Sequence, residues 1–226
     1  MGVVLLFIGR GAEKQLGRRD GYVIVTVAWL AFSLFGMLPF YLSGYIPSIT
    51  NAFFETMSGF SSTGATILND IEKLPHGLLF WRSMTQWIGG LGIVFFTIAV
   101  LPIFGVGGIQ VFAAEASGPT HDKVHPRIGI TAKWIWGIYA GLTGTLIILL
   151  MFGGMNIFDS ICHAFATTST GGFSTKQASI EYYHSPYIEY VISIFMFISG
   201  INFTLLLLFV NGKLKKFVHD AELKWY

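Results

Sequence analysis

Two runs of small hydroxyl residues and glycine are the part of this sequence whose residue types could do chemistry. The first is Ser61-Ser62-Thr63-Gly64-Ala65-Thr66 and the second is Thr168-Ser169-Thr170-Gly171-Gly172-Phe173-Ser174, with Gly171 placed 107 positions after Gly64. An ion that sheds its water needs a ring of oxygens, which backbone carbonyls supply when successive C=O groups turn the same way. Glycine reaches the positive-φ conformations that this arrangement needs at little steric cost. The pattern therefore predicts two ion-binding strands in which Gly64 and Gly171 are obligatory.

The pairing of the two runs is what favours an ion path over an ordinary turn. A single Ser-Thr-Gly run is a common turn composition, but each run here lies between two long apolar stretches. Unsatisfied backbone groups in hydrocarbon are costly, so a polar strand at membrane depth must face protein or a water-filled path. We therefore expect a pore in which the backbone carbonyls of the two strands bind an ion. The residues that we expect to bind it are Ser62, Thr63, Gly64, Ala65, Ser169, Thr170, Gly171 and Gly172.

The composition places the chain in a bilayer. Of 226 residues, 53% are hydrophobic and 12% are charged, and the mean hydropathy is +0.63. Soluble domains carry about 25% charged residues. Basic residues are dispersed in short segments between the apolar runs, so no nucleic-acid-binding face is expected. The single cysteine, Cys162, excludes an internal disulfide.

The hydrophobic pattern predicts an all-α membrane protein built from tandem helix/pore-loop/helix repeats, as in potassium channels. A membrane-crossing helix needs about 20 apolar residues, whereas a stretch of about 10 is too short. The four expected crossings are 22–42, 79–105, 134–155 and 190–211, and the two short pore helices are 52–60 and 159–167. The expected organisation is a preceding helix end and basic segment at 1–20, a first pore repeat at 21–109, a connector at 110–133, a second pore repeat at 134–212 and a tail at 213–226.

The two short helices are expected to begin at N-caps and to end at the strands. Asn51 and Asp159 are good N-cap residue types. The partially negative C-terminal end of each helix would then favour a cation near the membrane centre. We interpret Glu55 as a structural carboxylate, because a helix side chain cannot easily join a ring of carbonyls. Arg82 lies at a helix end, where it could reach the membrane surface or pair with an acid of a short helix.

Three glycines in the second crossing predict a close helix contact. Gly89, Gly90 and Gly92 are small residues of the kind that let helix backbones approach where lipid gives no hydrophobic driving force. We expect them to face another helix.

The distribution of Lys and Arg predicts the orientation in the membrane. The segments 10–19, 123–133 and 213–224 hold 11 of the 14 basic residues, and only Lys73, Arg82 and Lys176 lie elsewhere. The excess of basic residues in cytoplasmic segments puts the connector and the tail in the cytoplasm and both pore loops outside. A multi-pass protein of the plasma membrane is expected.

The motifs of this chain resemble those of the Trk-type potassium uptake proteins, in particular the TrkH subunits of the Trk/Ktr/HKT superfamily. The resemblance is carried by Ser58-Gly59-Phe60-Ser61-Ser62-Thr63-Gly64-Ala65-Thr66, Trp81-Arg82-Ser83, Gln86-Trp87-Ile88-Gly89-Gly90-Leu91-Gly92, Phe158-Asp159-Ser160-Ile161-Cys162-His163-Ala164-Phe165, Ser169-Thr170-Gly171-Gly172-Phe173-Ser174 and Gly200-Ile201-Asn202-Phe203. It implies four repeats in one polypeptide, arranged with pseudo-fourfold symmetry around a K⁺ filter. It also implies a homodimer on a cytosolic ring of TrkA-type nucleotide-binding subunits. The chain departs from this pattern because it holds two repeats instead of four.

Three other classes of protein are alternatives to a pore. An intramembrane enzyme could use Cys162 and His163, but neighbouring helix residues project about 100° apart and do not form a ready nucleophile and base. His121 and His125 could bind a metal, but Pro119 and Pro126 flank them and disfavour a helix that presents both. A non-conducting half-protein that binds partners stays open, as do Na⁺ in place of K⁺ and coupling to another ion. No cofactor is expected beyond the transported ion.

Overall fold

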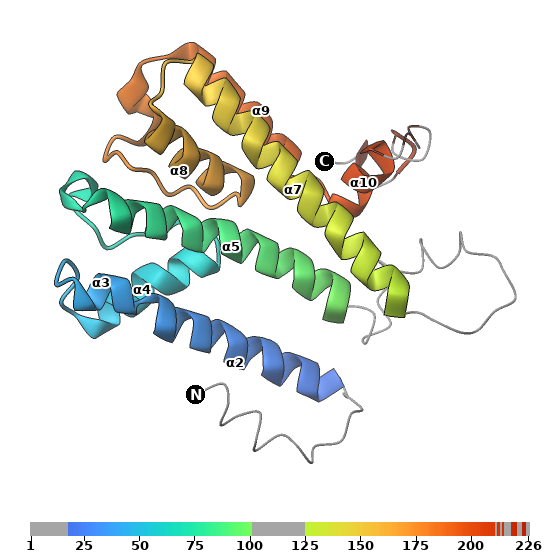
Figure 1. Cartoon of the computed structure of the whole chain (residues 1–226), viewed down its shortest axis with the longest axis horizontal. Coiled ribbons are helices and arrows are strands. Elements are labelled where there is room, and N and C mark those ends of the chain that lie inside the picture. The colour runs from blue at the N-terminus through green and yellow to red at the C-terminus, as the bar shows by residue number, and fades with distance from the viewer. Residues whose placement is uncertain are drawn as a thin grey trace, which may run out of the picture.

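The computed structural model describes residues 18–100 and 125–210, together with 212, 214, 218–220 and 223–224. Within these residues every regular element is a helix, which agrees with the all-α prediction. The long helices lie side by side with two short helices between them (Figure 1).

The first half of the fold places a short helix between two long ones. The helices in chain order are α2 (Arg18–Gly36), α3 (Leu38–Leu42), α4 (Ile49–Phe60) and α5 (His76–Val100). Helix α4 packs between α2 and α5 (Figure 1). The crossing expected at 22–42 is interrupted at Met37, because Pro39 lacks a backbone N–H and its ring crowds the preceding turn.

The second half repeats this plan with α7 (His125–Phe152), α8 (Ile157–Thr168), α9 (Pro186–Gly200) and α10 (Phe203–Val210). Helix α8 packs against α7, α9 and also α5, so α5 contacts both short helices. The crossing expected at 190–211 is not one helix, because Ile201 takes an extended conformation (φ −69°, ψ 140°) and α10 starts after it. Helix α7 begins at His125, inside the stretch expected as a connector; residues 101–124 lie outside the described ranges.

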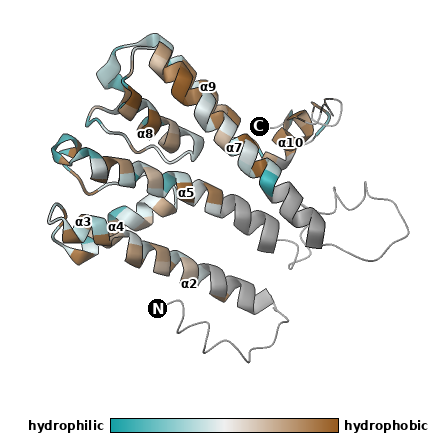
Figure 2. Cartoon of the chain, in the orientation of Figure 1, coloured by the Kyte–Doolittle hydropathy of each residue, from teal (hydrophilic) through white to brown (hydrophobic). Residues whose placement is uncertain are grey.

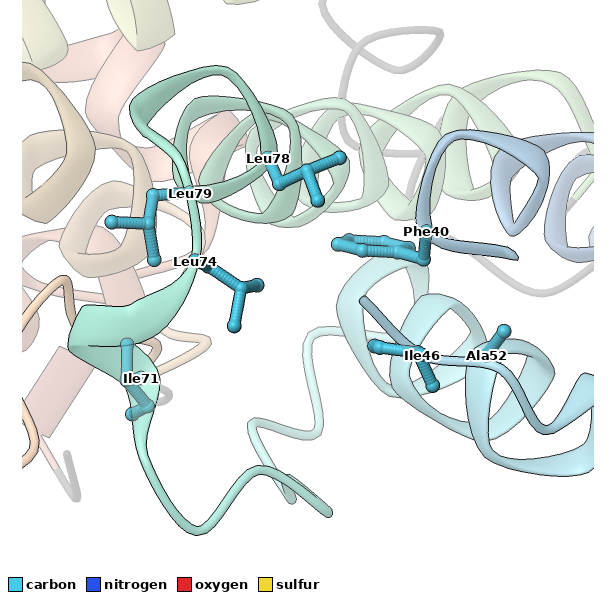
Figure 3. Close-up of a cluster of buried hydrophobic side chains, with 7 residues drawn as sticks. All are labelled: Phe40, Ile46, Ala52, Ile71, Leu74, Leu78 and Leu79. Carbon is cyan, nitrogen blue, oxygen red and sulfur yellow. The ribbon is translucent and has the colours of Figure 1, made fainter. Parts of the chain in front are cut away.

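Two clusters of buried apolar side chains pack against the short helices. In the first, Phe40 and Ile46 converge on α4, while Leu74 approaches from the segment before α5 and Leu78 from the first turn of α5 (Figure 3). Burial of apolar area contributes about 25 cal/mol per Å² removed from water. The full first cluster is Phe40, Ile46, Ala52, Ile71, Leu74, Leu78 and Leu79, and the second is Leu146, Leu150, Met155, Ala164, Ile188, Ile192 and Phe195.

Apolar side chains also cover the outer faces of the helices. Figure 2 shows that the described parts of α2, α7 and α9 carry hydrophobic residues along much of their length. Among the described residues, one helical stretch, Lys133–Phe152, is long and apolar enough to cross a membrane, and Thr26–Leu42 and Pro186–Gly200 are shorter apolar helices. Large exposed apolar faces of this kind mark surfaces that contact a membrane or another protein.

Candidate ion-binding site

Two helix–loop segments of the structure share one backbone plan. The first helix–loop segment is residues 48–67 and contains α4, and the second is residues 156–175 and contains α8. Each helix has 12 residues. After each helix, the amide of Ser62 or of Thr170 donates to the carbonyl three residues back at 3.0 Å. The two predicted ion-binding strands therefore leave their helices through the same turn.

The positive-φ residues of the two loops correct the register expected from the sequence. Ser62 and Thr170 both have φ 54°, and Gly64 (φ 77°) corresponds to Gly172 (φ 82°). The two segments are thus 108 positions apart, as Gly64 is from Gly172, and not 107. Gly171 is not among the positive-φ residues, so the conformational reason given for it applies to Gly172 instead.

A signal for the correct register was present in the sequence. With an offset of 108, Thr66 pairs with Ser174, so each conformational glycine is followed two positions later by a hydroxyl residue. With an offset of 107, Thr66 would pair with Phe173. The adjacent Gly171 and Gly172 made both alignments plausible from residue identity alone.

A glycine is required at position 171 because there is no room for a side chain. A Cβ built on it would lie 2.6 Å from Nε2 and 2.7 Å from Oε1 of Gln86, a residue of α5. A Cβ on Gly64 would in turn collide with the carbonyl oxygen of Gly171. The two loops therefore lie side by side at these glycines, although more than a hundred residues separate them in the chain.

The eight residues predicted to bind the ion differ in their exposure. The structure brings the two strands together at Gly64 and Gly171, and it leaves part of each strand uncovered. Ser169 and Gly171 are buried, Ser62 and Gly64 are half-buried, and Thr63, Ala65, Thr170 and Gly172 are exposed.

The N-caps lie one turn before the positions expected from the sequence. Ser48 accepts a hydrogen bond from the amide of Asn51 at 3.4 Å, and Asn156 accepts one from the amide of Asp159 at 2.8 Å. Asn51 and Asp159 are thus the third helical residues, so the expectation that they cap the helices was wrong. Each helix is three residues longer at this end, or two in α8, because a polar residue earlier in the chain takes the cap.

An ion pair inside the protein braces the first helix–loop segment. Glu55 and Arg82 are 1% and 2% exposed, and the guanidinium Nε lies 2.7 Å from Oε1 of the carboxylate. Thr66 Oγ1 donates to the same Oε1 at 2.8 Å, and the amide of Ile67 donates to Oε2 at 3.0 Å. Arg82 therefore pairs with the acid of the short helix, which was one of its two expected roles.

The second helix–loop segment has a brace of different chemistry. His163 occupies the position of Glu55 in the 108-residue register, and its Nε2 lies 2.9 Å from Oγ of Ser174. Its Nδ1 lies 2.8 Å from the carbonyl of Asp159. The hydroxyl of Thr175 donates to Oδ1 of Asp159 at 2.6 Å. Both ring nitrogens of His163 are thus engaged with the loop and its own helix, and neither is directed at Cys162 as a base.

Helix α5 also fits closely against the ends of both short helices. A Cβ on Gly89 would lie 2.7 Å from the carbonyl carbon of Phe60, the last residue of α4. A Cβ on Gly90 would lie 2.6 Å from the hydroxyl of Tyr139 and 3.0 Å from Cβ of Ser169. The close contact expected for these two glycines is confirmed, whereas Gly92 meets Trp29 only at an ordinary 3.6 Å.

The surface loops after the two segments are joined to each other. The amide of Ile71 donates to Oε1 of Gln177 at 3.1 Å, and the amide of Gln177 donates to Oε1 of Glu72 at 3.4 Å. Next to this link, a hydrogen bond from Lys73 lowers the pKa of the Asp70 carboxyl below its ordinary value. The two halves are therefore tied together at the ends of the helices as well as at the loops.

Sequence reasoning missed the role of Gln86 and the contacts that Arg82 makes with the second loop. Gln86 accepts a hydrogen bond from the amide of Phe173 at 3.1 Å, and its Nε2 is buried without a hydrogen-bond partner. The Arg82 guanidinium lies 3.6 Å from the centre of the Phe173 ring. A helical spacing of four between Arg82 and Gln86 places both on one face, which is the signal that was available. His121 lies outside the described residues, so the expectation that His121 and His125 do not form a metal site is not tested.

The helical fold and its exposed apolar faces are typical of a membrane protein, and comparison with known proteins gives the family of the chain. The chain matches the TrkH family of cation transport proteins over residues 1–224. It therefore belongs to that family. Membership in a transport family agrees with the expectation that the chain is not an enzyme.

Several named relatives support this assignment. The chain is 44% identical to the Trk system potassium uptake protein TrkH of Escherichia coli strain K12, over 100% of this chain and 47% of that protein. It is 37% identical to the TrkG protein of the same strain, over 99% of this chain and 48% of that protein. The crystal structure of the potassium transporter TrkH from Vibrio parahaemolyticus superposes with a TM-score of 0.78 at 37% identity, over 95% of this chain and 45% of that chain. The chain thus spans about half the length of these relatives.

Proposed function

We propose that this chain forms two of four repeats of a membrane pore for potassium uptake. The observation that carries the proposal is the matched pair of loops, which share positive φ at Ser62 and Thr170 and at Gly64 and Gly172. Two loops of the same backbone conformation can present equivalent carbonyls to one ion. Similarity to proteins named as potassium uptake proteins supports K⁺ as that ion.

The short helices supply the electrostatic part of the mechanism. Helices α4 and α8 both end where the loops begin, at Ser61 and Ser169. The C-terminal end of a helix carries a partial negative charge of about half an elementary charge. A partly dehydrated cation on the loops is stabilised by both helix ends and by backbone carbonyls that need no reorganisation when it arrives. The residues we assign to the filter are Ser62, Thr63, Gly64, Ala65, Ser169, Thr170, Gly171 and Gly172.

The remaining half of the carbonyl ring has to come from elsewhere. Two loops give half of a fourfold filter, and the relatives are about twice as long as this chain. In the complete pore, four helix/pore-loop/helix repeats surround the ion, and this chain contributes four membrane-crossing helices and two pore helices. One alternative is a half-protein that binds partners without conducting, and the other is a sodium-permeable relative. The first alternative stays open because this chain spans only about half the length of its relatives.

We also propose the orientation and partners of the complete protein. Figure 1 places the start of α2, the end of α5 and the start of α7 at one end of the fold. In the sequence, the basic segments 10–19 and 123–133 coincide with the starts of α2 and α7. Positive segments are retained in the cytoplasm, so the loops between α4 and α5 and between α8 and α9 face outward. The family resemblance implies a homodimer in the plasma membrane bound to TrkA-type cytosolic subunits.

A chimera tests the function. Residues 1–226 would replace the matched region of Escherichia coli TrkH, and the chimera would be expressed in cells that lack their own potassium uptake systems. We expect growth at low K⁺ and uptake of K⁺ in preference to Na⁺. The 226-residue chain expressed alone is the comparison, because growth without the added half would show that copies of this chain complete the ring. A chimera that reaches the membrane and carries neither ion would contradict the proposal.

A further inference from the structure

Glu55 is the point at which the first loop is fastened. Its carboxylate accepts from the Thr66 hydroxyl at 2.8 Å and from the Ile67 amide at 3.0 Å, while it pairs with Arg82 at 2.7 Å. The carboxylate thus has a partner on the loop for each of its oxygens. The carboxylate contacts the loop at Thr66 and Ile67, the two residues that follow the proposed filter residue Ala65.

Arg82, the partner of Glu55, also contacts the second loop. Its Nη1 donates to the carbonyl of Ser174 at 3.0 Å, and its guanidinium stacks on the ring of Phe173 with 3.6 Å to the ring centre. Gln86, one turn further along α5, accepts from the Phe173 amide at 3.1 Å. Arg82 therefore reaches the second loop at the two residues that follow Gly172.

We propose that the Glu55–Arg82 pair is a clamp that fixes the two filter loops relative to each other and so sets the cation selectivity of the pore. The chain of contacts runs from Ile67 through Glu55 and Arg82 to Ser174, and it joins loops that are in contact at Gly64 and Gly171. A carbonyl filter discriminates between cations by its size and by the field of its dipoles, and both depend on how the loops are spaced.

The chemistry of the pair fits a positioning role better than a simple contribution to stability. A buried ion pair is often no more stabilising than apolar residues of the same shape, because both charges lose their hydration. Arginine is suited to the task because its planar, multi-donor head can bond a carboxylate and a carbonyl at once and also stack on a ring. A lysine in its place could make the ion pair but not all three contacts.

The experiment uses the chimera described above and rests on the proposed function for its transport readout. The principal variant is Glu55→Gln with Arg82→Met, which leaves no unpaired charge inside the protein. The matched control is Trp81→Phe, at the neighbouring residue of α5, whose Nε1 donates to the Gly36 carbonyl of α2 at 2.9 Å and not to either loop. We expect equal membrane levels for both, and a K⁺ over Na⁺ uptake ratio that falls about tenfold in the double variant only. This is the effect of losing the one hydrogen bond from the charged Arg82 to the second loop, at the Ser174 carbonyl.

A second measurement separates the clamp from the transport function. Hydrogen exchange of the purified chimera would be compared for Glu55→Gln, which alters the first loop's own brace, and for Arg82→Lys, which alters the second. The clamp predicts that each single variant speeds exchange in both loops, at the Ile67 amide and at the Phe173 amide. Faster exchange confined to the loop that the altered residue touches would overturn the proposal, as would an unchanged uptake ratio in the double variant. A parent chimera that carries no K⁺ would reject the proposed function while the exchange result still decides the clamp.

Discussion

The first helix–loop segment is braced by an ion pair, whereas the equivalent positions of the second are occupied by a histidine and a network of hydroxyls. Glu55 and His163 take the same place in their helices, and each bonds the loop that follows. Only Glu55 also bonds a residue of another helix, Arg82. One backbone plan is thus held by two kinds of side chain, and the charged brace is the one that reaches across to the other half.

The largest effect should come from breaking the charged brace. Glu55→Leu leaves Arg82 charged inside the protein without its partner, and we expect a loss of about 3 to 5 kcal/mol in the free energy of unfolding. His163→Leu removes hydrogen bonds to neutral groups and should cost about 1 to 3 kcal/mol. Unfolding of the purified chimera in detergent measures both. Equal losses would show that the ionic character of the first brace does not matter.

The next effect concerns how α5 fits each short helix. Gly89→Leu forces a side chain against the backbone of Phe60, which cannot move away, and overpacking of this kind costs about 1 to 3 kcal/mol or more. Gly90→Leu meets the Tyr139 hydroxyl and Ser169, and the tyrosine can shift, so we expect a smaller loss. Gly77→Leu is the control on the same helix, because nothing lies within 4 Å of its Cβ. Normal membrane levels and uptake for Gly89→Leu would show that this face is not packed.

Substitutions of the glycines in the two proposed filter loops should act by two different mechanisms. Gly64→Ser and Gly172→Ser place a side chain at positive φ, at a cost of about 1 to 2 kcal/mol each, and should weaken the preference for K⁺ over Na⁺. Gly64→Ser also pushes on the carbonyl oxygen of Gly171, whereas nothing lies within 4 Å of a Cβ on Gly172, so Gly172→Ser is the purely conformational variant. Gly171→Ser instead pushes on Gln86, so adding Gln86→Ala should restore part of the preference for that variant and none for Gly172→Ser. Ion uptake by the chimera gives the ratios. If Gln86→Ala restored the K⁺ preference of both Gly171→Ser and Gly172→Ser, or if no glycine variant lost that preference, the two glycines would not be required for different reasons.

The smallest effect concerns the caps. Asn156 holds the Asp159 amide at 2.8 Å and donates from Nδ2 to its carboxylate at 2.7 Å, whereas Ser48 has one longer bond of 3.4 Å to the Asn51 amide. We expect Asn156→Ala to lower the free energy of unfolding by about 1 kcal/mol and Ser48→Ala by about 0.5 kcal/mol. Thermal unfolding in detergent would resolve the difference. A larger loss for Ser48→Ala would mean that the first cap is the tighter one.

Local patterns in the sequence were enough to predict the helices and to place the Ser-Thr-Gly runs after the two short helices. Apolar runs predict helices wherever they occur, and the Ser-Thr-Gly runs lie in the structure directly after the two short helices, as expected. The interruptions at Met37 and Ile201 were missed, because hydropathy reports the environment of a stretch and not the continuity of its backbone hydrogen bonds. The caps were missed by three residues because several polar residues near each helix start are suitable.

What only the tertiary structure decided is how the two halves meet. The sequence by itself determined the class of protein, the short helices and the glycine-rich loops, because composition and spacing are local properties. The register of 108, the contact of Gly64 with Gly171 and the reach of Arg82 to Ser174 all depend on how α5 packs between α4 and α8. Residue identity says that a buried arginine needs partners, but only packing selects which of the possible acids and carbonyls lie within hydrogen-bonding distance.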